Sequence, residues 1–204
     1  MAIGHRQTIL GLGPQSSAKV FQGTPGTWGY GLASETRVVW RLYAEGYRRA
    51  AEKLFAVWSA DLRDGSYLLF PMAYLYRHHV ELRIKELLFA CADYLQLPSD
   101  WRLNHDLVQF WALLRPLLVQ ASPDMPAQEL DNVERIIIEL SSKDPKSFLF
   151  RYPADLAGSF HFSDLDALDL ENYCGTLRQL SRFLDCVSDC LQTELQVRDD
   201  ALDP

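Results

Sequence analysis

The chain has 204 residues, of which 48% are hydrophobic and 23% are charged, and its formal net charge at pH 7 is -7. These values are typical of a folded globular domain and exclude a long disordered acidic chain. The acidic balance argues against extensive non-specific binding to nucleic acid, because neutralising phosphates requires a surplus of Lys and Arg on the binding surface. It remains compatible with a local basic patch.

The first 34 residues are rich in glycine. Seven of the eleven glycines of the chain lie in this segment, and glycine at this density makes regular structure entropically costly. We therefore predict an irregular arm over residues 1–34, a helical bundle domain over residues 35–198 and an acidic tail over residues 199–204.

Apolar residues spaced three or four positions apart predict four successive helices after the arm. The first runs from Thr36 to Trp58. The second has Pro71 in its first turn, where the missing N–H of proline is tolerated, and runs to about Leu95. Asn104 is the expected N-cap of the third helix, and the fourth helix opens at Pro126.

The last third of the chain contains a different pattern and then a fifth helix. Between Ser147 and Phe162 aromatic residues alternate with other residues, which predicts a short β-hairpin or two extended segments. The apolar residues of the last helix then step alternately by three and four, and they are Leu170, Tyr173, Leu177, Leu180, Leu184, Val187 and Leu191. Such a seam requires a facing helix. The sequence therefore predicts an all-α bundle of about five helices with a short aromatic β-hairpin or extended insert.

The four cysteines and the N-terminus indicate a cellular compartment. The cysteines lie in apolar helical patterns and form no Cys-x-x-Cys pair; they are Cys91, Cys174, Cys186 and Cys190. We expect buried free thiols in a reducing environment. We find no secretory signal and no apolar window long enough for a membrane span, so we expect a cytoplasmic protein with no membrane contact.

The second predicted helix carries a charged group at the edge of its apolar stripe. At about 100° per residue, Arg77 and Glu81 fall along the margin of the face that should be buried. The two side chains are four residues apart and can form a partly desolvated ion pair, with Lys85 beyond it. This pair has two interpretations, a structural ion pair at a helix edge and part of a functional site.

Histidines provide the candidate acid and base groups. His78 and His79 are adjacent and point about 100° apart on a helix, so they cannot both bind one metal ion without other segments. No metal-binding motif supports them, and we expect no metal and no cofactor. One of them is a candidate general acid or base, and a surface histidine is the alternative. His105 and Asp106 open the third helix, where they either start the helix or meet a phosphate at its N–H groups.

Arg151 and Tyr152 lie in the aromatic segment. An arginine beside exposed aromatic rings can stack on a nucleobase or contact a phosphate. A cation packed over a core ring is the alternative. We list Glu81, Lys85, Asp106, Arg151 and Tyr152 as candidate ligand-binding residues.

The run Glu81-Leu-Arg-Ile-Lys85-Glu-Leu-Leu88, followed by His105-Asp106-Leu107, resembles the Glu-x-x-x-Lys-x-Leu-Leu and His-Asp-Leu signature of HEPN domains. The resemblance implies a helical bundle that is usually dimeric and occurs in prokaryotic toxins, abortive-infection and other defence proteins, and RNA-processing factors. It covers a short part of the chain.

One feature of active HEPN ribonucleases is missing from this sequence. In that family an Arg is followed four to six residues later by a His, and no Arg of this chain has a His at that spacing. Arg77 is followed directly by His78 and His79. An improvised catalytic set of Arg77, His78 or His79, and His105 would still supply the base, acid and cation that metal-independent RNA cleavage requires.

The leading hypothesis is therefore a HEPN-like homodimeric module of a defence or stress system that binds RNA or a nucleotide, with ribonuclease activity open. A partner protein of a defence operon is included in this hypothesis. The alternative is a catalytically inactive homo-oligomeric interaction or scaffold protein. The binding hypothesis predicts that Arg77, Lys85, His105 and Arg151 converge in one basic cleft.

Overall fold

A computed structural model describes residues 36–61, 63, 65–101, 104–155, 157–160 and 169–202 of the chain. The chain divides between Ser34 and Glu35 into two units, and the described residues all belong to the second. The expected glycine-rich arm lies outside the described residues.

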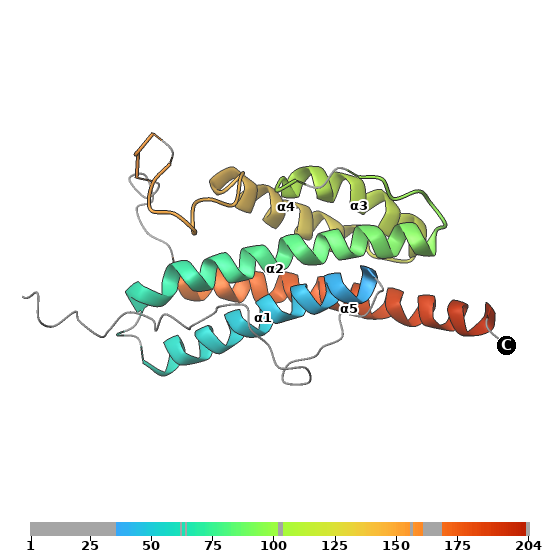
Figure 1. The fold of residues 1–204 in the computed structure, drawn as a ribbon, viewed down its shortest axis with the longest axis horizontal. Coiled ribbons are helices and arrows are strands. Elements are labelled where there is room, and N and C mark those ends of the chain that lie inside the picture. Colours follow the sequence, from blue (N-terminus) through green and yellow to red (C-terminus); the bar gives the residue numbers. More distant parts are fainter. Residues whose placement is uncertain are drawn as a thin grey trace, which may run out of the picture. The chain divides into compact units, whose positions relative to one another are not determined.

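The described residues form five α-helices, as Figure 1 shows. They are α1 (Thr36–Ala60), α2 (Gly65–Tyr94), α3 (Leu107–Ala121), α4 (Ala127–Lys143) and α5 (Leu170–Leu202). The expected all-α bundle is therefore confirmed. Within the described residues, no helix combines the length and apolar character needed to span a bilayer.

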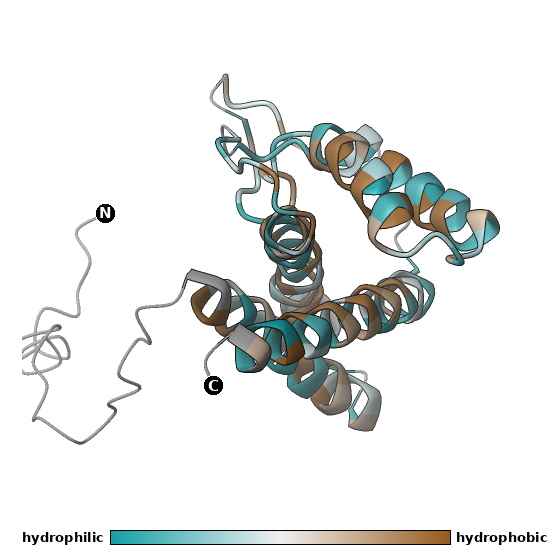
Figure 2. Ribbon diagram, turned by 90° about the vertical axis from the view of Figure 1, so that its right-hand side faces the viewer, coloured by the Kyte–Doolittle hydropathy of each residue, from teal (hydrophilic) through white to brown (hydrophobic). Residues whose placement is uncertain are grey.

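Helix α2 is the central element of the bundle. It packs against α1, α3 and α5, while α4 packs against α3. α1 and α5 lie on one side of α2, and α3 and α4 lie on the other (Figure 1). Hydrophobic and hydrophilic residues both occur along the helices (Figure 2), and no residue between positions 72 and 94 of α2 is exposed. Buried residues of all five helices, among them Ile84, Leu114 and Leu184, form the core.

The heptad seam of α5 finds its facing helix inside the same chain. Leu177, Leu180 and Leu184 are buried in the core cluster, and Tyr173 and Val187 pack at its margin. Since α5 packs against α2, the seam is satisfied without a second copy. It therefore carries no argument for a dimer.

Two predicted helix starts were wrong. α2 begins at Gly65, so Pro71 lies inside the helix. Pro71 is exposed, and the backbone carbonyl that loses its N–H partner there can bond to water. The N-cap of α3 is Asp106, whose carboxylate accepts the backbone N–H of Gln109 at 3.0 Å. Asn104 instead accepts the backbone N–H of Asp106 at 2.8 Å.

The last helix and the aromatic insert also differ from expectation. α5 continues to Leu202, so residues 199–202 of the expected acidic tail are helical. The aromatic hairpin is not shown. Residues 149–151 and 157–158 are turns or bends, and the described part of the insert has one isolated antiparallel bridge, between Ala154 and Phe160.

The cysteines fall into two classes. Cys91 and Cys174 are buried, as expected, but Cys186 and Cys190 are exposed on α5. The prediction of burial was wrong for this second pair because an apolar helical pattern does not reveal which side of the helix the neighbouring elements cover. Leu184, Ser188 and Leu191 on the same stretch of α5 are buried, whereas the side of the helix that carries the two cysteines is exposed.

Candidate functional site

Arg77 is a buried hub between three segments of the chain. Its Nη1 donates to Glu81 Oε2 at 2.7 Å, and its Nη2 lies 3.3 Å from the backbone carbonyl oxygens of both His105 and Asp144. Its Nε lies 3.2 Å from Asp144 Oδ2, an ionic contact without hydrogen-bond geometry. The guanidinium thus joins α2 to the start of α3 and to the end of α4. The sequence placed Arg77 at the margin of the core, whereas the structure buries it completely.

Glu81 lies beside Arg77 and accepts hydrogen bonds from two further side chains. Its Oε1 accepts from Lys85 Nζ at 2.6 Å and from His105 Nδ1 at 2.8 Å. Burial by itself raises the pKa of Glu81, but the hydrogen bond from Lys85, the charges of Lys85 and Arg77, and the hydrogen bond from His105 together hold it below its ordinary value. Glu81 is therefore an ionised carboxylate in the interior.

His105 is the part of this cluster that reaches the surface. Its side chain is 55% exposed, although its Nδ1 faces the fully buried Glu81 carboxylate. A carboxylate only accepts hydrogen bonds, so Nδ1 carries the proton and Nε2 is the acceptor nitrogen of the neutral ring. This arrangement orients an imidazole for proton transfer at Nε2.

Lys85 is not a solvent-facing cation. Its side chain is 7% exposed and its Nζ lies 5.1 Å from the centre of the Phe110 ring. With Arg77, Glu81 and Asp144 it forms a group of two positive and two negative charges that neutralise one another. The interior group is therefore closed to an external phosphate.

His78 and His79 lie apart from this cluster. His79 is buried, its Nδ1 lies 2.9 Å from the carbonyl oxygen of Ala44 on α1, and burial lowers its pKa to about 4. The His78 ring stacks on Tyr74 and meets Tyr47 edge-on, and burial lowers its pKa. Among the contacts of the described residues, neither histidine hydrogen-bonds to Arg77, Glu81 or His105. The improvised catalytic set is thus reduced to His105 and its supporting residues.

Asp144 connects the Arg77 hub to the loop after α4. Its Oδ1 accepts the backbone N–H groups of Phe148 at 2.7 Å and Leu149 at 3.1 Å. These bonds hold a tight turn in which Ser147 has a left-handed φ of 60°. Backbone in that region is strained for a residue with a side chain, so the turn depends on the carboxylate that Arg77 holds.

This loop and the last residue of α4 line a pocket with a volume of about 700 Å³. Its lining includes two lysines, Lys143 and Lys146, and two half-exposed aromatic rings, Phe148 and Tyr152. Arg151 lies over these rings, with its guanidinium carbon 4.9 Å from the centre of the Phe148 ring and 5.8 Å from that of Tyr152.

Arg151 is also tied back to the protein. Its guanidinium carbon lies 5.7 Å from the centre of the Tyr74 ring, and its Nε donates to the carbonyl of Ser147. Sequence reasoning placed Arg151 in the same cleft as Arg77, Lys85 and His105. The structure brings the last three together around Glu81 and keeps Arg151 on the neighbouring loop, so the single basic cleft does not form.

Asp106 is occupied as a helix cap. Its carboxylate accepts the backbone N–H of Gln109, and its exposed position is that of an N-cap in the first turn of α3. Of the two interpretations of Asp106, helix initiation and phosphate contact, its contacts support helix initiation.

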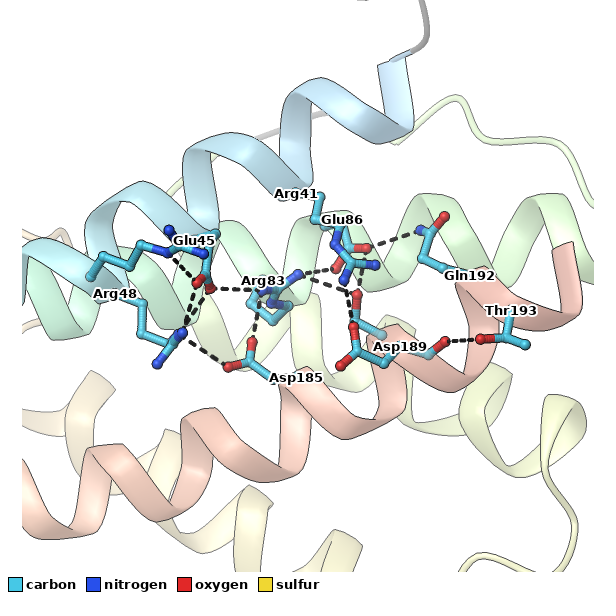
Figure 3. Close-up of polar contacts among 11 residues, drawn as sticks. Arg41, Glu45, Arg48, Arg83, Glu86, Asp185, Asp189, Gln192 and Thr193 are labelled. Atoms are coloured by element: carbon cyan, nitrogen blue, oxygen red, sulfur yellow. Dashed lines mark hydrogen bonds and ion pairs between the residues drawn. The ribbon is translucent and has the colours of Figure 1, made fainter. Parts of the chain in front are cut away.

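A second charged cluster joins α1, α2 and α5, and sequence reasoning missed it (Figure 3). Arg83 Nη1 donates to Glu86 Oε2 at 3.1 Å, and Arg83 Nη2 lies 2.7 Å from Asp185 Oδ1. Ser188 Oγ and Gln192 Nε2 donate to Glu86 Oε1 at 2.8 and 3.1 Å. Arg83 and Glu86 are almost fully buried.

The α1 residues extend this second cluster to the surface. Arg48 pairs with Glu45 and lies 3.4 Å from Asp185, and Arg41 pairs with Asp189 at 2.6 Å. The hydrogen bond from Arg48 lowers the pKa of Glu45 to about 2, whereas burial raises the pKa of Asp185. Mutual pairing of its charges indicates that the cluster sets the register of three helices. The i, i+3 spacing of Arg83 and Glu86 was the available signal, but their partners on α5 lie about 100 positions later.

Within the described residues, no group of three or more His, Cys, Asp or Glu side chains could hold a metal ion. Comparison of the chain with models of known protein families, with curated proteins and with solved structures produces no match.

Proposed function

We propose that this chain is a HEPN-like helical module that binds RNA or a nucleotide at the pocket beside Arg151. The observation that carries the proposal is the lining of that pocket. Two half-exposed rings, Phe148 and Tyr152, stand beside Lys143 and Lys146, with Arg151 over the rings. Bases stack on aromatic rings irrespective of sequence, and Lys and Arg bind the phosphates between them.

The Arg77 hub supports the proposal by linking the pocket to His105. One nitrogen, Nη2, contacts the carbonyl oxygens of both Asp144, which lines the pocket, and His105. An RNA strand that leaves the pocket toward α3 would pass the exposed imidazole of His105. The ribonuclease part of the proposal therefore assigns proton transfer to His105, positioned by Glu81, with Arg77 as a buried positioning residue. The HEPN resemblance adds a defence or stress system as the setting, with a partner protein of the same system.

Binding is tested by fluorescence anisotropy with labelled single-stranded RNA and with a fluorescent nucleotide. Stacking on an aromatic side chain contributes about 1–3 kcal/mol per base, so Tyr152→Ala should weaken binding by roughly tenfold. Arg151→Ala should weaken it comparably and reduce its salt dependence. Tyr43→Ala is the matched control, because Tyr43 is equally exposed but lies on α1. Equal binding by all four proteins would remove the proposed site.

Cleavage is tested separately with labelled RNA in the presence of EDTA. His105→Ala should abolish cleavage, and Glu81→Gln should reduce it, because the imidazole loses the carboxylate that orients its Nδ1. Cleavage that persists in His105→Ala excludes this residue as the acid or base. RNA bound but not cut by the wild-type protein restricts the function to binding.

A homo-oligomeric scaffold is the second candidate, and the outer face of α1 favours it. Val38, Leu42, Tyr43 and Val57 are all more than two-fifths exposed on this helix. Exposed apolar residues that recur on one helix are typical of contact surfaces between subunits. Since the α5 seam is used inside the chain, a homodimer would have to use a face such as this. Light scattering should give a dimer that Leu42→Asp converts to a monomer, and a wild-type monomer at micromolar concentration would exclude it.

A further inference from the structure

Three sulfur-containing residues line one groove on the side of the bundle where α5 passes the ends of α2 and α3. The groove has a volume of about 470 Å³. Cys186 and Cys190 line it from α5, and Met125 lines it from the turn between α3 and α4. Apolar side chains, including Leu118 and Phe183, make up much of the remaining wall.

Packing does not explain the two cysteines. The other two thiols, Cys91 and Cys174, are fully buried, whereas Cys186 and Cys190 are exposed. They are four residues apart on one helix, so their side chains project in nearly the same direction. Their thiols also interact with each other. The helix thus presents a pair of accessible sulfur ligands to a groove whose other wall holds a thioether.

We propose that Cys186, Cys190 and Met125 form a binding site for copper(I). Soft thiolate and thioether ligands favour soft cations, and a monovalent d¹⁰ ion accepts a small set of sulfur ligands without a full tetrahedral shell.

The same surroundings argue against zinc. A structural zinc site takes four nitrogen, sulfur or oxygen ligands. Glu194 also lines the groove, but within the described residues no three His, Cys, Asp or Glu side chains converge closely enough to hold a metal. Two thiols and one thioether therefore match copper(I) better than they match zinc.

A metal ion that binds the two thiols displaces their protons. Each thiol releases one proton to solvent when copper(I) binds, so the complex carries one more negative charge than the free protein.

The test is an anaerobic titration of the full chain with copper(I) against a chromogenic copper(I) chelator. We expect one tightly bound equivalent. Cys186→Ser and Cys190→Ser should each weaken binding at least tenfold, and Met125→Leu, which preserves volume, should weaken it several-fold. Thr193→Ala is the matched control, because Thr193 is an exposed α5 residue outside the groove. Both cysteines are exposed, so circular dichroism should show all variants folded.

Thiol counting provides an independent measurement. In the native protein two of the four thiols should react rapidly with a disulfide reagent, and one equivalent of copper(I) should protect both. The proposal is overturned if the Cys186→Ser/Cys190→Ser double variant retains copper as well as the wild type does. It is also overturned if the wild type surrenders copper as readily as that variant, or if Met125→Leu binds copper unchanged. None of these results depends on RNA binding.

Discussion

Replacing Arg77 with methionine should destabilise the protein more than any surface substitution. The variant keeps most of the side-chain volume but removes the donor to Glu81, the charge beside Asp144 and the contacts to two backbone carbonyls. Glu81 retains Lys85 and His105, but Asp144 is left as a buried carboxylate that only backbone N–H groups satisfy. Removing one partner of a buried ion pair costs about 3–5 kcal/mol, a large part of the free energy of unfolding of an ordinary domain.

Urea denaturation followed by tryptophan fluorescence measures this loss, since Trp111 lies in the core. The matched control is Arg135→Met, because the Arg135 side chain is 67% exposed and lies 3.7 Å from Glu139. An exposed pair of this kind contributes well under 1 kcal/mol. Arg77→Lys should recover part of the loss by restoring the charge. If Arg77→Met costs no more than Arg135→Met, Arg77 does not act as a buried hub and the link from the pocket to His105 fails with it.

Three further predictions concern stability. Burial lowers the pKa of His79 from 6.5 to about 4, so the folded state disfavours the protonated ring. The folded state is therefore fully stabilised by the neutral ring above pH 6.5. About 3 kcal/mol of the free energy of unfolding is lost as the pH falls to 4. Urea midpoints of His79→Gln between pH 7 and pH 4 should therefore fall less than those of the wild type, and parallel curves would contradict this. Asp106→Ala should cost about 1 kcal/mol through loss of the α3 cap, while Asn104→Ala should cost less; the reverse order in thermal melts would restore Asn104 as the cap. Leu184→Ala should cost about 2–5 kcal/mol by opening a cavity in the seam between α5 and α2, and a neutral result in urea denaturation would place that seam outside the core.

The Arg77 site illustrates how far sequence reasoning extends. Helical spacing places Arg77 and Glu81 on one edge of α2, and it predicted their ion pair correctly. It did not predict how deeply Arg77 is buried. The residues that cover its guanidinium are Asp144, which lies 67 positions later in the sequence, and the loop after α4. The same limit explains Arg83 and Glu86, whose surroundings come from α5. A helical wheel gives the direction of a side chain and contains no information about what covers it.

The sequence by itself determined the all-α class, the number of helices in the described part and much of the core stripes, although Leu42 and Tyr43 of the expected α1 stripe are exposed. These properties depend on the period of apolar residues, which is local. Only the tertiary structure decided that the α5 seam faces α2 within the chain, that Cys186 and Cys190 are exposed, and that His105 stands at the surface on a buried carboxylate. Each of these depends on which distant segment packs against a helix, and that choice is made by the summed burial and charge pairing of the whole bundle.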